Sequence, residues 1–410
     1  MVEIWRWEPN SGQGSTERLS WYTSIASTRQ GKEERTRRRE HPRRTIEFQS
    51  VLRDSYDQRL FDAAMAREQS TGWLMPLWWD ACQPGLDVLI GDEVQITGSS
   101  PGFEEIAFRD WRVGQHVVMR RGRLYESFEI TEITSTYVRG TPHPSAEFQA
   151  STARLTAWPA WEGVLSSTVI NPRMSAGSSQ VSVLFEVEDY LSPESQAWPT
   201  QYSGLDLFDE PPGQGSAMID AEIQSLIEIL DGNIGPFIAA DVGDRPFVDR
   251  VQRHLLYDRE RSWRMRRWWQ KIGGSQGTWW CPTWHNDLTI LGASATELRA
   301  YWGPEGLEDD PATTHPPLYQ QSYGYPGRQN IYLQRVGEDP DAVAITGSDG
   351  PEDSYEILNT TPTLPDFSAD DVRQCSWLEP VRMATDDVTI QWLTPEVGLW
   401  QLAMRMVDDD

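Results

Sequence analysis

The chain has 410 residues, a formal net charge of −26 and an aromatic-rich composition, with 20 Trp, 13 Tyr and 11 Phe. This length is enough to bury a sizeable core in two domains or in one elaborated domain, and the aromatic content excludes a globally disordered chain. The excess of carboxylates opposes nonspecific binding to nucleic acid, because a phosphate backbone is held through Lys and Arg.

The cysteines and the apolar runs limit the protein class further. Cys82, Cys281 and Cys375 lie far apart without CxxC spacing, so neither a disulfide framework nor a zinc knuckle is indicated, and we expect synthesis in a reducing cytoplasm. No run approaches the roughly 18 apolar residues of a membrane span, and the N-terminal sequence does not resemble a signal peptide. We therefore expect neither membrane insertion nor secretion.

The first feature along the chain is a run of basic residues inside this acidic protein. Charge runs are commonly exposed and solvated, so one interpretation is a hairpin loop without a partner. Binding of DNA and contact with an acidic protein surface are the alternatives. The run consists of Lys32, Arg35, Arg37, Arg38, Arg39, Arg43 and Arg44.

A unit of a strand, a short helix and a Gly-Trp-rich strand occurs twice, over residues 44–81 and 245–287. Each Trp of such a unit buries on the order of 200 Å², so we interpret these Trp residues as core. One unit alone would leave an apolar face uncovered, and a second unit or further chains in a ring would supply the missing surface. The matched positions are Trp73, Pro76 and Trp78 in the first copy and Trp279, Pro282 and Trp284 in the second.

Short alternating segments predict half-buried antiparallel strands. Further strand pairs are expected within residues 114–133 and 328–336. The predicted fold class is mainly β with a few short helices, in antiparallel β-sandwich or barrel domains that carry the internal duplication. One face of an alternating strand is formed by Val181, Val183, Phe185 and Val187, and one face of another by Val388, Ile390 and Trp392.

One segment, residues 216–232, has helical periodicity. We predict an amphipathic helix there, with Ser216 as its N-cap and Gly232 as its end. Residues 188–215 and 303–328 are rich in Pro, Gly and acidic residues and predict long loops. The first of these loops is taken as a linker between an N-terminal β-rich domain, 1–187, and a C-terminal one, 216–410. The apolar face of the expected helix comprises Met218, Ile223, Leu226, Ile227 and Leu230.

The sequence predicts no catalytic, cofactor or metal site, and we expect a protein that is not an enzyme. Cys281 and His285 are four residues apart, but Pro282 and the neighbouring Trp residues favour a strand, where this spacing does not make a metal pair. The motifs GxSxG and HExxH and a phosphate-binding glycine loop are absent from the sequence. Acidic pairs such as Asp386 and Asp387 are expected by chance among 62 acidic residues.

Several segments together resemble tail proteins that long-tailed bacteriophages and prophages encode just after the tape-measure gene. In the first segment, Gly31, Glu34 and Arg35 follow a Trp strand, and Pro42 with two Arg residues precedes an aromatic strand, a pattern similar to distal tail proteins. The chain is longer than the shorter distal tail proteins and has a second Trp unit. The similar segments are residues 18–49, 72–80, 140–144, 277–288 and 381–397.

The resemblance implies a structural virion protein at the tail tip or baseplate, with a tail-tube-like core. Its copies would form a ring that joins the tail tube to the baseplate hub and lets the genome DNA pass without specific binding. The implied partners are further copies of the chain, the tail tube protein, the baseplate hub protein and the tape-measure protein. The ring would hold three or six copies, and a two-unit chain would give pseudo-sixfold symmetry from three. The basic run would then lie at a subunit interface.

Two alternatives remain at the level of sequence. A carbohydrate- or receptor-binding tail module predicts several Trp residues exposed in a groove. A glycan-cleaving tail enzyme requires two carboxylates about 5–10 Å apart in a cleft, one with a raised pKa.

Overall fold

The computed structural model of the chain is dominated by antiparallel strands. The α-helices of the described residues are α1 (Ser55–Arg67) and α4 (Arg259–Ile272). The prediction of a mainly β protein with a few short helices is confirmed. The structure describes residues 2–10, 12–27, 33–67, 72–83, 85–88, 93–97, 108–142, 144–145, 155–166, 169, 171–172, 178–188, 193–213, 219–224, 227–230, 238–241, 247–294, 296–301, 328–352 and 355–407.

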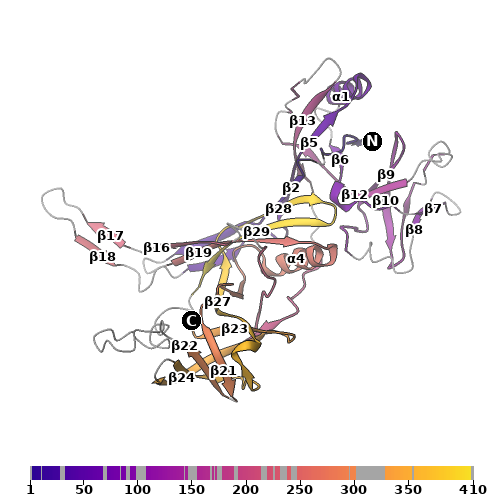
Figure 1. Cartoon of the computed structure of the whole chain (residues 1–410). Helices are drawn as coiled ribbons and strands as arrows, with labels where there is room; N and C mark the ends of the chain where they lie inside the picture. The colour runs from indigo at the N-terminus through magenta and orange to yellow at the C-terminus, as the bar shows by residue number, and fades with distance from the viewer. Residues whose placement is uncertain are drawn as a thin grey trace.

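A long antiparallel sheet forms the centre of the molecule (Figure 1). Its strands bury alternate residues, as the two predicted faces require: Val183 and Phe185 lie in one strand and Ile390 in another, all of them buried. In order across the sheet, the strands are β13 (Ser179–Val187), β5 (Arg43–Leu52), β2 (Ser15–Ser20), β28 (Asp387–Thr394), β29 (Val397–Met406), β19 (Phe247–Leu256) and β16 (Ile219–Gln224).

An N-terminal lobe continues from one end of this sheet. The strand pair expected within residues 114–133 is present as the hairpin β9–β10, and the lobe has its own apolar core around Ile96 and Phe128. The strand order is β1 (Glu3–Ile4), β6 (Trp73–Pro76), β12 (Leu155–Leu165), β9 (His116–Arg121), β10 (Leu124–Ile133), β11 (Tyr137–Thr141), β8 (Val94–Thr97) and β7 (Gly85–Val88).

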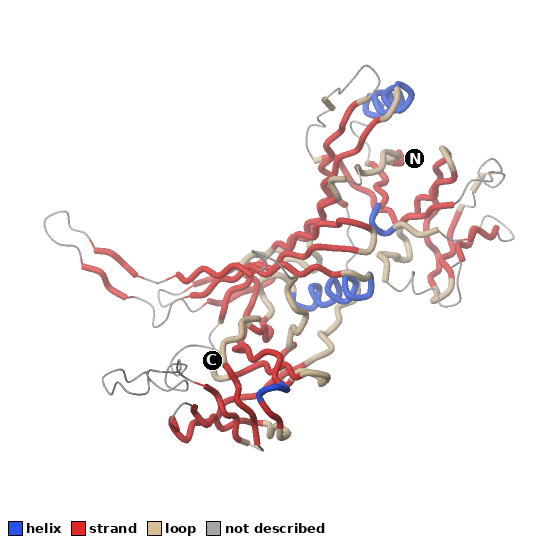
Figure 2. The backbone as a smooth tube through the Cα atoms, viewed as in Figure 1, coloured by secondary structure: helices blue, strands red, loops and turns tan. Residues whose placement is uncertain are grey.

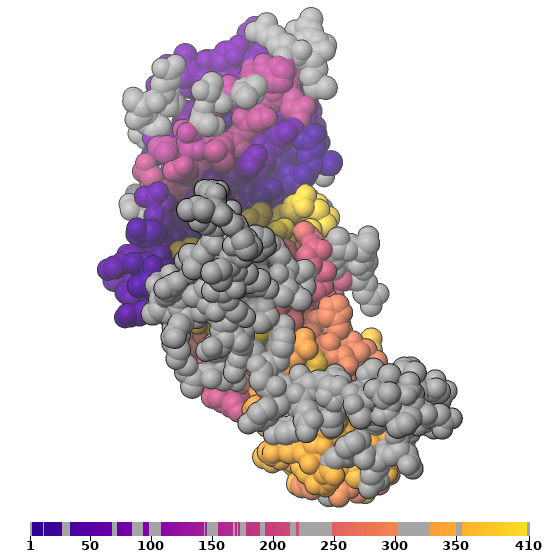
Figure 3. Space-filling view, turned by 90° about the vertical axis from the view of Figure 1, so that its left-hand side faces the viewer, coloured from indigo at the N-terminus to yellow at the C-terminus, as the bar shows by residue number. Residues whose placement is uncertain are grey.

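A C-terminal lobe is built on β27 and has a separate core around Leu298 and Leu358. Figure 3 shows the orange C-terminal lobe and the indigo-to-magenta N-terminal part at opposite ends of the molecule. Residues 328–336 hold the single strand β23 in place of the expected strand pair, and the partners of β23 come from outside this segment. The strand order is β20 (Thr278–Pro282), β27 (Val372–Met383), β23 (Asn330–Arg335), β24 (Asp341–Glu352), β25 (Tyr355–Thr361), β22 (Glu297–Tyr301), β21 (Thr289–Ser294) and β26 (Phe367–Ser368).

The same order of elements occurs twice along the chain. The first series is β2, the β3–β4 hairpin (Thr23–Ser27, Glu33–Arg37), β5, α1 and β6. The second is β16, the β17–β18 hairpin (Ile227–Leu230, Ile238–Asp241), β19, α4 and β20. The registers correspond too, since Ser15 pairs with Phe48 and Ile219 pairs with Gln252 at the same separation along the chain. We call the first series together with β12 and β13 the first unit, and the second series together with β27 and β29 the second unit.

The helix expected over residues 216–232 is wrong. The described parts of this segment are the strands β16 and β17, and β16 pairs with β19 from Ile219↔Gln252 to Gln224↔Phe247. The sequence around Ile219 and Ile223 also alternates between apolar and polar residues, and β-branched Ile favours strands. Pairing with the edge of β19 selects the strand over the helix. This partner strand comes from another part of the chain, so the local sequence does not reveal it.

The segment expected to be a linker, residues 188–215, packs against the rest of the protein where it is described. Its described residues 193–213 pack on α4, where Trp198 and Phe208 are buried. The ring of Phe208 stacks on Trp268 of α4 at 4.8 Å between centroids. The second predicted loop, 303–328, lies outside the described residues except for Arg328.

Candidate assembly interface

The two units meet edge to edge through β28. This strand pairs with β29 of the second unit on one side and with β2 of the first unit on the other, from Ser15↔Trp392 to Ser20↔Asp387. The indole of Trp392 also stacks on Trp79, which belongs to the short 3-10 helix Trp78–Asp80, at 5.6 Å and an interplanar angle of 5°. The junction thus combines a backbone ladder with aromatic packing.

A cluster of buried charges lies beneath this junction, and we call Glu17, Arg44, Asp110 and Arg266 the charged cluster. Arg44 Nε lies 2.8 Å from Glu17 Oε1, and its Nη1 lies 2.5 Å from Asp110 Oδ2. Arg266 of α4 reaches Glu17 Oε2 at 2.6 Å. These side chains are at most 3% exposed. The helix α4 is thereby tied directly to β2 and, through Glu17, to β5.

The carboxylates of the charged cluster stay ionised because the cations lie so close. Burial by itself raises the pKa of Glu17, but the charges of Arg266 and Arg44 and a hydrogen bond donated by Trp392 bring that pKa below its usual value. Asp110 is also desolvated, and the charges of Arg44, Arg112 and Arg266 hold its pKa low. Removing one charge would leave its partners buried and uncompensated.

A second polar contact joins the units at the turn between β27 and β28. The carboxylate of Asp386 accepts hydrogen bonds from Thr23 N and Thr23 Oγ1 at 2.5 and 2.7 Å, and from Ser275 N and Ser275 Oγ at 3.0 and 2.7 Å. Burial alone would raise the pKa of Asp386, but these hydrogen bonds lower it. Asp387 beside it pairs with Arg18. Asp386 and Asp387 therefore each make structural contacts at this turn.

The β3–β4 hairpin packs on the second unit. Arg35 Nη1 donates to the carbonyl oxygens of Ser275 and Met383 at 3.0 and 3.1 Å, and its side chain is 3% exposed. Glu33 lies 3.7 Å from Arg405 of β29. The second unit therefore holds the β3–β4 hairpin of the first unit in place.

The structure corrects part of the predicted subunit interface. Arg35 and Arg44 are buried inside their own chain. Arg35 donates to the carbonyl oxygens of Ser275 and Met383, and Arg44 pairs with the carboxylates of the charged cluster. Arg37 and Arg39 lie over the rings of Trp21 and Tyr22 at 5.1 and 5.4 Å. Arg35 and Arg44 therefore make intramolecular contacts, while Arg37 is exposed and Arg39 is half-buried. Of the other members of the basic run, Arg38 and Arg43 are exposed, and Lys32 lies outside the described residues.

The Trp units are mainly core. Trp73 and Trp279 are 2% and 0% exposed, and they contact Trp5 and Trp268 at ring distances of 5.4 and 5.2 Å. Pro76 and Pro282 end their strands, β6 and β20. The third pair differs, since Trp78 is buried in a 3-10 helix while Trp284 is half-buried with a φ of 60°.

The outer margins of the two units differ. Along β13, the chain after β12 covers part of the edge, with Ser166 N donating to Leu184 O and Gln180 N donating to Pro172 O. This is the side on which β28 covers β29 in the second unit. At the other margin, β16 pairs with β19 alone among the described strands. Figure 2 shows the β17–β18 hairpin extending beyond it.

The Trp-lined groove of the described residues does not offer open rings on which sugars could stack. An open groove of about 330 Å³ includes Trp78, Trp79, Trp158 and Trp392 in its lining, but these side chains are at most 8% exposed and their rings contact one another. The Trp side chains of the described residues are buried or half-buried. This disfavours the carbohydrate-binding alternative, which predicts exposed Trp.

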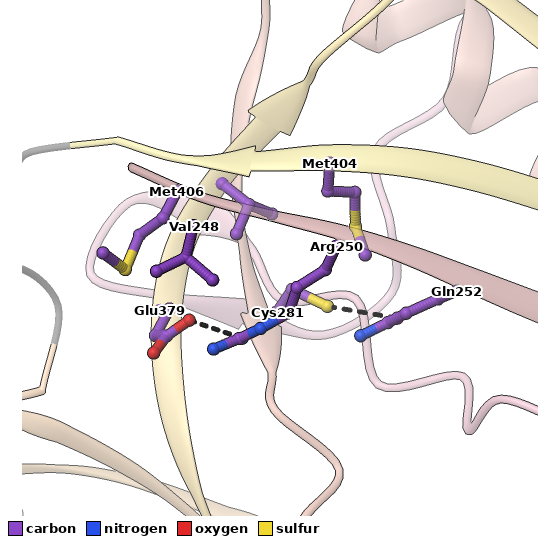
Figure 4. A pocket seen from close by; sticks show the side chains of 8 residues that line it. Val248, Arg250, Gln252, Cys281, Glu379, Met404 and Met406 are labelled. Atoms are coloured by element: carbon purple, nitrogen blue, oxygen red, sulfur yellow. Dashed lines mark hydrogen bonds and ion pairs between the residues drawn. The ribbon is translucent and has the colours of Figure 1, made fainter. Parts of the chain in front are cut away.

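Cys281 and His285 do not form a metal pair. Figure 4 shows Cys281 in an interior site between β19, β20, β27 and β29, where its thiol contacts Gln252 Oε1 at 3.6 Å. Arg250 and Glu379 form a 2.5 Å ion pair there, and the side chains leave no room for a water molecule. His285 is exposed. Among the described residues, no group of three or more His, Cys, Asp or Glu side chains is arranged to hold a metal ion.

No protein-family model matches the chain, and no curated protein is similar to it in sequence. The resemblance to distal tail proteins therefore stays a prediction. None of the helices in the described part of the chain is long and apolar enough to cross a membrane.

Proposed function

We propose that this chain is a structural protein of the bacteriophage tail tip. Its copies join into a closed ring that connects the tail tube to the baseplate hub and leaves a passage for DNA. The chain is made in the cytoplasm of the host bacterium and acts in the virion. Its function is mechanical and depends on interface geometry, with no bond chemistry.

The observation that carries this proposal is the edge-to-edge joining of the two units. We infer that they arose by internal duplication, because their element order and registers correspond. In the first unit the edge of β2 is covered by β28, whereas β16, in the corresponding place, is paired on one side among the described strands. An edge of this kind is a template for pairing with another chain.

Head-to-tail contacts of this kind generate rings when the rotation between copies closes. Each chain contributes two units, so three copies would place six units around the axis, and six copies would place twelve. The net charge of −26 suits a conduit, because an acidic lining does not retain DNA. The tail tube, hub and tape-measure proteins are the proposed neighbours above, below and within the ring.

Light scattering and electron microscopy of the purified full chain test the proposal, with and without isolated tail tubes. A closed ring with a central hole, bound to the end of the tube, is the expected result. A monomer under both conditions would overturn the proposal. Digestion of a capsular or cell-wall glycan by the purified chain would instead support an enzyme.

A further inference from the structure

The β17–β18 hairpin has a sequence that fits poorly with its position. Its two strands pair with each other, from Ile227↔Asp241 to Leu230↔Ile238, and with no other strand of the described chain. Figure 1 shows the hairpin standing away from the lobes. An isolated two-stranded hairpin is marginally stable in water. Yet residues 227–241 are rich in apolar side chains, namely Ile227, Ile229, Leu230, Ile234, Phe237, Ile238, Ala239 and Ala240.

The β3–β4 hairpin shows what covers the corresponding hairpin inside the chain. Each hairpin lies between the first and second strands of its unit. The β3–β4 hairpin packs on the neighbouring unit, where Arg35 contacts the carbonyl oxygen of Met383 at the end of β27. The β3–β4 hairpin thus shows one way in which a hairpin at this place in a unit packs on the neighbouring unit. For β17–β18, the described part of the chain holds no further unit of this kind on which the hairpin could pack.

We propose that the β17–β18 hairpin of one copy packs on the first unit of another copy, at the end of β12. The proposal rests on the proposed ring and names its contact surface. Arg35 pairs with Ile25 in its hairpin, and Ala239 pairs with Ile229 in the corresponding place. Met383 pairs with Met404 at the end of β27, and Leu165 pairs with Phe185 at the end of β12. Ala239 thus corresponds to Arg35, and Leu165 corresponds to Met383. By analogy with the Arg35–Met383 contact, Ala239 of one copy would lie near Leu165 of the next.

The chemistry of the two surfaces agrees with this assignment. Inside the chain, Arg35 of the hairpin meets backbone carbonyls beside Arg382. At the corresponding place in β12 the side chain is Val164, which is 38% exposed, followed by the half-buried Leu165. The internal contact therefore joins a hairpin and a strand end that both carry charged residues. The proposed contact between copies joins the apolar sequence of β17–β18 to the exposed apolar end of β12. Burial of both surfaces against each other is favourable.

Cross-linking of the full chain tests the contact. We combine Ala239→Cys with Leu165→Cys and treat the protein with a short bis-maleimide. The native cysteines Cys82, Cys281 and Cys375 are buried and serve as an internal background. The expected result is a ladder of covalent multimers that ends at the copy number of the ring. Ala239→Cys combined with Tyr257→Cys, an exposed position on another part of the chain, is the matched control and should give no ladder.

A second variant tests the energetics without altering the core. Val164→Arg places a charge in the proposed contact and should raise the concentration at which half of the chains are assembled about tenfold or more. Val336→Arg changes another exposed valine and should leave that concentration unchanged.

The outcomes separate the hairpin contact from the ring. If microscopy shows rings but the Ala239/Leu165 pair gives no ladder, or Val164→Arg and Val336→Arg assemble alike, the hairpin contact is overturned while the proposed function stands. If the full chain forms no ring even with tail tubes, the proposed function itself fails. A ladder specific to the Ala239/Leu165 pair, with weakened assembly of Val164→Arg, supports the contact.

Discussion

The two hairpins that leave the central sheet at corresponding places have different surroundings. The β3–β4 hairpin is held by Arg35 and Glu33 against the second unit, whereas the β17–β18 hairpin pairs only within itself among the described strands. The same topology thus makes an internal contact at one end of the sheet, while at the other end the hairpin pairs with no further described strand. The comparison teaches that equivalent hairpins can have different packing in one chain, and in the proposed ring another copy would supply the contact that β17–β18 does not make in its own chain.

The largest expected effect comes from breaking the internal junction at the charged cluster. Glu17→Gln removes one of the two buried carboxylates that balance Arg44 and Arg266 and leaves Asp110 as the other, so we expect a loss of about 3–5 kcal/mol in the free energy of unfolding. Urea unfolding followed by Trp fluorescence measures it. Arg18→Ala, which removes a partly exposed ion pair from the same strand, is the control and should cost no more than about 1 kcal/mol.

The charged cluster also predicts the response to acid. The pKa values of Glu17 and Asp110 are lowered in the folded chain, so the unfolded chain binds more protons below the ordinary pKa of about 4. Their contribution is present above that pH and is lost as the pH falls through the folded pKa values. In the same urea experiment, Glu17→Gln should show a shallower loss of stability below about pH 4 than the wild type. Parallel curves would contradict the prediction.

A smaller effect distinguishes the second unit from the first. His254 of β19 is fully buried, and burial lowers its pKa to about 4, while the corresponding residue of β5 is the uncharged Ser50. Between the ordinary pKa of about 6.5 and this value, the unfolded chain takes up a proton and the folded chain does not. The free energy of unfolding should therefore fall by about 3 kcal/mol from pH 6.5 to 4.

His254→Gln tests this effect of pH, since Gln retains a donor toward the carbonyl oxygen of Pro211, 3.3 Å from the imidazole. The variant should lose less stability between pH 6.5 and 4, as measured by urea unfolding at a series of pH values. Equal slopes in the variant and the wild type would show that His254 does not produce the dependence.

A change at Asp386 sharpens the comparison of the hairpins. Asp386→Ala removes hydrogen bonds that hold Thr23, the first residue of the β3–β4 hairpin, to Ser275. We expect a loss of about 1–3 kcal/mol, seen as a lower urea midpoint. Asp339→Ala, at an exposed turn, should have little effect. A similar loss in both variants would argue against a specific role for the Asp386 contact.

The smallest and most local prediction concerns hydrogen exchange. In the unassembled chain, the amides of residues 227–230 and 238–241 should exchange faster than those of residues 23–27 and 33–37, because only the latter hairpin packs on a neighbouring unit. Assembly should slow exchange in the β17–β18 hairpin and leave the β3–β4 hairpin unchanged. Mass spectrometry of peptides from both segments measures the difference, and equal protection in the unassembled chain would remove the contrast.

Several features were predictable because they depend on residues close together in the chain. The alternation of Val181, Val183 and Phe185 predicts a strand with one buried face, and the structure has that strand. The strand–helix–strand order at residues 44–81 was also visible, because the same pattern recurs at residues 245–287. The structure adds that Asp54 and Asp258 each cap the first turn of the helix in their unit. Alternation and recurring patterns are local, so short segments of sequence report them.

Other features were decided by contacts between distant residues. The segment at 219–230 satisfies helical and strand periodicities together, and pairing with β19 selects the strand. The basic run gives no sign that Arg44 is buried, because its partners Glu17 and Asp110 come from other parts of the chain. The sequence by itself determined the mainly β class and the recurring Trp units. Only the tertiary structure decided which edges are covered, because a strand's backbone groups are satisfied by whichever segment the fold brings alongside.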